Sequence, residues 1–129
     1  MTADDNATIL ANLRQRVAEF VAARDWEQFH TPKNLSLAIA IEVAELMEHF
    51  QWLTDERASA AMQDEAKRTA VADELADVLI YALSLANALD VDVCTAVLDK
   101  LERNERRFPT QEWRGRARGV NDASHRTAS

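Results

Sequence analysis

The sequence predicts an all-α fold, a bundle of four helices, and three observations lead to this. Apolar residues recur at three- and four-residue steps along four segments, which is the spacing of one face of an α-helix. Helix breakers are scarce, because both glycines, Gly115 and Gly119, stand near the C-terminus and the only prolines are Pro32 and Pro109. The 129 residues suffice for one domain with a sizeable core. We expect that domain to span residues 1–109.

The first predicted helix runs from about Ala7 to Arg24. It carries a single apolar stripe formed by Ile9, Leu13, Val17, Phe20 and Val21. Thr31 can cap a second helix, in which Pro32 occupies the first turn and which extends to about Trp52. This helix is apolar on nearly every side, so we expect it in the middle of the bundle.

Two further helices follow a segment that the sequence leaves open. Residues 53–63 are polar and rich in alanine, and they suit either a loop or a short helix. Asp64 can cap a third helix, also apolar and central, that continues to about Leu89. Asp92 can cap a fourth helix that ends near Arg107, before a proline that cannot continue it.

The rest of the chain carries no periodic signal. From residue 110 to 129 it holds glycines and several arginines, which is typical of a disordered basic tail. Cys94 is the single cysteine, so no internal disulfide can form, and its apolar neighbours predict a buried, reduced thiol.

Charge and hydropathy exclude several classes of function. The formal net charge of −7 disfavours a broad nucleic-acid surface, although a small anion could bind where metal ions supply positive charge. No apolar run approaches the roughly 20 residues that a membrane span needs. The N-terminus has Asp4 and Asp5 where a secretory signal has basic residues. We therefore expect a cytoplasmic protein that binds neither nucleic acid nor membrane.

Four carboxylates form two pairs with the same spacing. Glu42 and Glu45 lie three residues apart on the second predicted helix, and Glu74 and Asp77 do so on the third, so each pair shares a helix face. Both pairs stand in apolar segments, where an unpaired ionised carboxylate costs several kcal/mol to bury. Basic side chains are few there, which favours a hard divalent cation as partner. We predict that these four residues hold Mg²⁺, for which Mn²⁺ can substitute; a solvated acidic face is the alternative.

Other polar groups suit a phosphate ligand. Tyr81 falls on the face of Glu74, seven residues later. One face of the fourth predicted helix carries Lys100, Arg103, Asn104 and Arg107. These cations beside an apolar stripe can reach the edge of a pocket, or can simply be solvated and offset the helix dipole.

His49 raises the question of a zinc or di-iron site, because it shares a face with Glu42 and Glu45. Di-iron bundles use a Glu-x-x-His spacing, whereas His49 lies four residues after Glu45 and the third helix has no histidine. We interpret it as a packing or interface residue.

These residues together resemble the all-α nucleoside triphosphate pyrophosphatases, the MazG-like superfamily. The signature is Glu42-x-x-Glu45, 28 intervening residues, and Glu74-x-x-Asp77. The resemblance covers about Val17 to Pro109. Within the superfamily, the sequence resembles the dCTP pyrophosphatase branch most specifically. This resemblance is carried by Arg24-Asp25-Trp26, Phe29-His30, Pro32-Lys33-Asn34, Glu42-Val43-Ala44-Glu45-Leu46, Phe50-Gln51-Trp52, Glu74 to Tyr81, Lys100, Asn104 and Arg106-Arg107-Phe108-Pro109. His49, and Phe108 in place of a tyrosine, depart from the pattern.

The resemblance implies a fold, a reaction and a site. It implies a MazG-type domain in a homo-oligomer, with a tetramer favoured over a dimer, that hydrolyses a deoxynucleoside triphosphate to the monophosphate and diphosphate. The four carboxylates would hold magnesium, with Glu45 as the candidate general base and Lys100 stabilising phosphate charge. The nucleotide would contact Lys100, Asn104 and Tyr81, and its base pocket would be shaped by Trp26, His30 and Trp52. Two alternatives stay open: another triphosphate such as dUTP as substrate, or a non-enzymatic helical module whose acidic face binds a basic partner.

Overall fold

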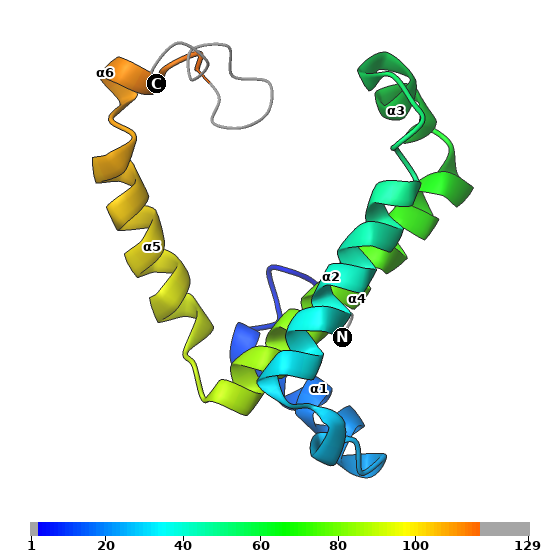
Figure 1. Cartoon of the computed structure of the whole chain (residues 1–129), viewed down its shortest axis with the longest axis vertical. Coiled ribbons are helices and arrows are strands. Elements are labelled where there is room, and N and C mark those ends of the chain that lie inside the picture. Colours follow the sequence, from blue (N-terminus) through cyan, green and yellow to red (C-terminus); the bar gives the residue numbers. More distant parts are fainter. Residues whose placement is uncertain (1–2, 117–129) are drawn as a thin grey trace. The chain divides into compact units, whose positions relative to one another are not determined.

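The computed structural model describes residues 3–116, in which every regular element is a helix (Figure 1). The all-α prediction is thereby confirmed. In chain order the elements are α1 (Leu10–Ala23), the 3₁₀ helix η1 (Glu27–Phe29), α2 (Pro32–Glu48), α3 (Asp55–Ala61), α4 (Glu65–Leu89), α5 (Val93–Arg107) and α6 (Thr110–Trp113).

Side-chain caps begin four of these helices. The Thr31 hydroxyl and the carboxylates of Asp64 and Asp92 each accept a hydrogen bond from the backbone N–H three residues later, at 2.9–3.1 Å. These are the three caps that the sequence predicts. Thr54 does the same for α3 at 3.3 Å, so the open segment between the second and third predicted helices contains a short helix.

The chain divides after Val91 into two compact units, Met1–Val91 and Asp92–Ser129, which are described separately. The division follows a helix terminus: Asp90 adopts a left-handed conformation (φ 53°), and the Val91 N–H donates to the Ala86 carbonyl at 3.0 Å. This pattern of bonds closes the last turn of α4 and ends the helix. The boundary falls inside the domain 1–109 predicted from the sequence.

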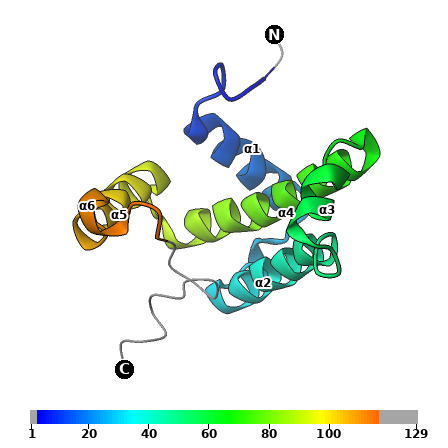
Figure 2. The same cartoon turned by 90° about the horizontal axis from the view of Figure 1, so that it is seen from above.

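In the first unit, α4 packs along α2 and also contacts α1 (Figures 1 and 2). Arg14 of α1 stabilises the contact between α1 and α4. Its Nε donates to Asn87 Oδ1 at 3.0 Å, and its guanidinium also donates to the Val91 carbonyl at 2.7 Å. The Asn87 amide returns a bond to the Arg14 carbonyl at 3.2 Å. The core consists of Val17, Val21, Leu35, Leu83 and Ala86.

The expected central position of α2 is not found within one chain. Leu35 is its only buried residue, while Leu37, Ile41 and Met47 are 53–59% exposed. The reason is that only one side of α2 faces α4, and the described residues provide no second layer over its other faces. Much apolar surface therefore stays open.

Two expectations about the C-terminal part are corrected. Cys94 is exposed rather than buried, because no residue of α5 is buried in the described chain. The predicted disordered tail instead begins with α6, where the Trp113 ring packs edge-on against Phe108 at 4.9 Å. Residues 117–129 of that tail lie outside the described residues.

Within the described residues, no single helix is both long and apolar enough to cross a membrane; only α4 and α5 taken together reach the required length and composition.

Candidate active site

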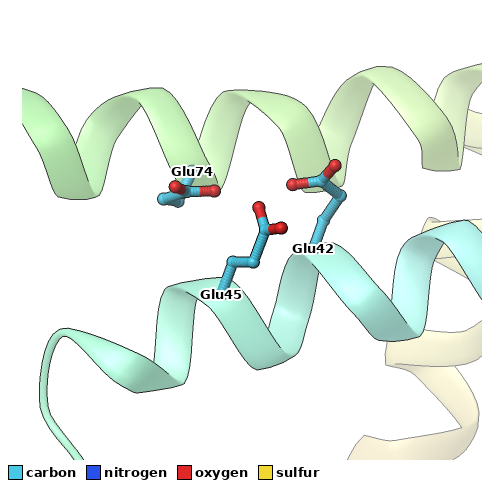
Figure 3. Close-up of side chains that lie close together, drawn as sticks. All are labelled: Glu42, Glu45 and Glu74. Carbon is cyan, nitrogen blue, oxygen red and sulfur yellow. The ribbon is translucent and has the colours of Figure 1, made fainter.

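Three glutamates converge between α2 and α4. Glu42 and Glu45 come from successive turns of α2, and Glu74 reaches toward them from α4 (Figure 3). One carboxylate oxygen of each lies within 4.8 Å of the others. The three-residue spacing on α2 turns its pair to one side, and the packing of α4 along that side brings in the third acid.

The cluster is electrostatically unfavourable as it stands. Glu42 Oε2 and Glu74 Oε2 are buried and receive no hydrogen bond from the described residues. Burial above all raises the pKa of Glu42 to about 7, helped by a hydrogen bond with Glu45 and by the charges of Glu45, Asp77 and Glu74. Burial and Glu45 likewise raise the pKa of Glu74, against a smaller lowering by His49. Within residues 3–116, no ion pair with a basic side chain neutralises these carboxylates.

A hard divalent cation fits this donor set. All the ligands are carboxylate oxygens, the ligand type that Mg²⁺ and Mn²⁺ take, and no nitrogen or sulfur ligand belongs to the cluster. A bound cation would also satisfy the two buried oxygens and offset the repulsion. Asp77 lies close enough for its charge to raise the pKa of Glu42 and Glu74, although its oxygens fall outside the 4.8 Å group.

A cavity of about 230 Å³ adjoins the cluster through Glu42 and Asp77. The remaining walls are mainly aromatic and apolar: Phe20, Val21, Trp26, His30, Ile80, Tyr81 and Ser84. The Trp26 ring meets Phe20 edge-on at 5.7 Å, and the ring centroids of His30 and Tyr81 are 6.4 Å apart. An acidic end beside an aromatic pocket can hold a metal-bound phosphate chain and a flat ring at once.

The turn after α1 positions two of these side chains. Asp25 takes a left-handed conformation (φ 53°), after which η1 carries the chain to His30. Trp26 N–H donates to the Val21 carbonyl at 3.1 Å, which holds the start of this turn against α1. The turn thereby delivers Trp26 and His30 to the same cavity as Tyr81 of α4.

The structure does not bring every predicted residue to this cavity. Trp52 is 86% exposed and is not among the residues that line it. Lys100 and Asn104 lie on α5, in the second unit, so their place relative to the carboxylates stays a prediction. His49 lies near Glu74, whose pKa it lowers, and its ring stands 6.5 Å from that of Phe50.

Four cavity residues have no counterpart in the site predicted from the sequence: Phe20, Val21, Ile80 and Ser84. Ser84 could have been found from spacing, because it follows Asp77 by seven residues and Tyr81 by three and so shares their helix face. The sequence predicts Phe20 only as part of the apolar stripe of α1. Its position at the cavity depends on the packing of α1 against α4.

The chain is similar to known proteins over most of its length. The family model described as MazG-like matches residues 37–122. The dCTP pyrophosphatase 1 proteins of Bos taurus and Homo sapiens are each 45% identical, over 93% and 90% of this chain and 71% and 68% of their own length. A solved pyrophosphatase from Archaeoglobus fulgidus superposes with a TM-score of 0.74 at 38% identity, covering 84% of this chain and 99% of the other.

The matched region contains the whole carboxylate cluster, and the relatives extend over most of the chain. The chain therefore belongs to the MazG-like family, in the branch of the dCTP pyrophosphatases.

Proposed function

We propose that this chain is a magnesium-dependent pyrophosphohydrolase that converts dCTP and water to dCMP and diphosphate. The observation that carries the proposal is the carboxylate cluster, which adjoins a largely aromatic cavity and has two buried oxygens without hydrogen-bond partners among the described residues. Relatives named dCTP pyrophosphatase 1, 43–45% identical over at least 90% of the chain, support the same reaction.

Glu42, Glu45 and Glu74 hold the cation, with Asp77 beside them. Mg²⁺ is the metal, and Mn²⁺ can take its place because both accept carboxylate and phosphate oxygens. When bound, the ion offsets the charge of the triphosphate, which this acidic protein would otherwise repel. By holding the ion, the carboxylate cluster can bind phosphate instead of repelling it.

The protein supplies a base and a binding frame. Glu45 sits between Glu42 and Glu74 and accepts a proton from the attacking water. The water oxygen forms a bond to the α-phosphorus, and the bond from that phosphorus to the bridging oxygen of diphosphate breaks. Lys100 stabilises the charge on the departing diphosphate, and Asn104 holds the phosphates.

The base binds in the aromatic pocket. Trp26 and Tyr81 offer ring surfaces for stacking, and His30 adds a polar edge. Trp52 also helps to shape the base pocket in this proposal, although it is largely exposed in one chain and does not line the cavity.

A nucleotide panel with diphosphate detection tests the reaction. We expect dCTP to be hydrolysed faster than dUTP or the other triphosphates, and only when Mg²⁺ or Mn²⁺ is present.

Glu45→Gln should lower kcat by at least about a hundredfold without changing the circular dichroism spectrum. Glu48→Gln, an exposed acid on the same helix, is the matched control and should keep its activity. Full turnover in excess chelator would refute the proposal, and an inactive protein that binds a basic partner in metal-free buffer would point to a helical interaction module.

We also propose that the chain assembles with copies of itself, as a tetramer. Leu37, Ile41 and Met47 on α2 are more than half exposed, and an apolar groove of about 530 Å³ lies between α2 and α4. A monomer rarely leaves so much apolar surface in water. Light scattering should give a mass of about 58 kDa, four times the 14.5 kDa of one chain. Met47→Glu should shift it downward, whereas a wild-type mass of one chain would contradict assembly.

The enzyme acts on free nucleotides in the cytoplasm and clears them from the pool, without nucleic acid or membrane as partner. Its net charge of −7 supports this, because it disfavours binding to a polyanion.

A further inference from the structure

Ser84 of α4 is a buried polar residue whose hydroxyl lacks a partner. The residue is 5% exposed, and its Oγ makes no hydrogen bond with any described residue. Buried hydroxyls are normally paired with protein, water or ligand, because an unpaired one destabilises the fold. Among the described residues, the other buried side-chain oxygens without partners belong to Glu42 and Glu74, in the carboxylate cluster.

Ser84 stands where two cavities meet. It lines the 230 Å³ cavity beside Glu42, and also a second cavity of about 460 Å³ that reaches Asn87. His30 and Ser84 are the polar residues common to both. The Asn87 amide bonds Arg14 through both its oxygen and its nitrogen, and it makes no hydrogen bond with the Ser84 hydroxyl.

The geometry of α4 decides which part of a nucleotide would meet Ser84. Asp77 and Ser84 lie seven residues apart on one face, which is two turns and about 10 Å along the axis. With the phosphates at the carboxylate end, the base lies about that far along the helix, beside Trp26 and Tyr81. The hydroxyl therefore stands near the polar edge of the base rather than near the phosphates.

We infer that the Ser84 hydroxyl hydrogen-bonds the polar edge of the nucleobase and so contributes to affinity for the nucleotide; this rests on the function proposed above. A serine hydroxyl rotates about one bond and can donate or accept. It can thus form a hydrogen bond with a ring nitrogen, a carbonyl or an exocyclic amine of the base. It strengthens binding of pyrimidines in general and does not by itself separate cytosine from uracil.

The test compares Ser84→Ala with Ser36→Ala. Ser36 is a helical serine on the exposed side of α2, and its hydroxyl is already bonded to the Lys33 carbonyl at 2.7 Å. Calorimetry with dCMP should show a Kd about 2- to 10-fold higher for Ser84→Ala, and the KM for dCTP should rise similarly with kcat unchanged. Inhibition by inorganic triphosphate, which has no base, should stay the same. Ser36→Ala should match the wild type throughout.

A stability measurement separates a ligand role from a structural one. Ser84→Ala removes an unpaired buried hydroxyl and introduces the best helix former, so the nucleotide-free Tm should rise, by about 2 to 5 °C. A variant with a higher Tm and weaker dCMP binding is the expected result. A lower Tm with unchanged dCMP binding would make Ser84 a structural residue and overturn the inference.

The remaining outcomes are also decisive. If Ser84→Ala weakens dCMP and inorganic triphosphate equally, the substitution distorts the whole site and the inference is wrong. If the wild type does not bind dCMP, the pocket assignment is wrong and the inference fails with it. If dCMP binds and Ser84→Ala weakens it, but dCTP is not hydrolysed, the inference stands while the proposed reaction fails.

Discussion

Acidification from pH 8 to pH 6 should weaken magnesium binding about tenfold, because a proton on Glu42 competes with the metal. The pKa of Glu42 is raised to about 7, mainly by burial. A carboxylate must be ionised to act as a ligand. With one such group, the protonated share of metal-free protein rises from about a tenth at pH 8 to about nine-tenths at pH 6, and the apparent Kd for Mg²⁺ rises by about tenfold. The raised pKa of Glu74 adds to the effect in the same direction.

The same pKa sets how stability depends on pH. Glu42 has an ordinary value of 4.5 in the unfolded chain and about 7 in the folded one, so the folded state binds the proton more tightly. Its contribution to the stability of metal-free protein is fully present below pH 4.5 and is lost as pH rises through 7. Mg²⁺ reverses this, because it binds the ionised cluster of the folded state. The rise in Tm on adding Mg²⁺ should therefore be larger at pH 8 than at pH 6.

Calorimetric titration of Mg²⁺ into metal-free protein at pH 6, 7 and 8, at constant ionic strength, measures the first effect, and thermal unfolding with and without Mg²⁺ measures the second. Glu48→Gln should show the pH dependence of the wild type, because Glu48 is exposed and lies outside the cluster. A Kd that changes less than twofold between pH 6 and pH 8, or a larger Tm gain at pH 6, would refute the reasoning.

Two further predictions concern the core and the pocket. Leu35 is 1% exposed, so Leu35→Ala should lower the free energy of unfolding by about 2 to 5 kcal/mol in urea titration. Ile9→Ala, at a residue 64% exposed, should change it by less than about 1 kcal/mol, and equal losses would contradict the assigned core. Trp26→Ala removes a ring from the pocket wall and should raise the KM for dCTP roughly 5- to 100-fold while largely sparing kcat. A loss of kcat at unchanged KM would show that Trp26 does not bind the base.

Local signals in the sequence were sufficient for the helices and for part of the site. Thr31, Asp64 and Asp92 cap helices as predicted, because capping depends on a side chain and backbone only three residues apart. The pairing of Glu42 with Glu45 follows from helical geometry in the same way. These relations involve neighbours in the chain, so they could be predicted without the fold.

What the tertiary structure decided are the contacts between distant segments. The approach of Glu74 to the pair on α2, and of Trp26 and His30 to Tyr81, depends on how helices pack, which periodicity does not specify. The exposure of α2 was also unpredictable, since an apolar face shows that a helix needs cover without showing whether its own chain or another copy provides it. Sequence by itself determined where the four long helices lie and which acids share a face. Packing alone determined that the acids from two helices meet beside an aromatic pocket, because a site formed across helices exists only once they dock.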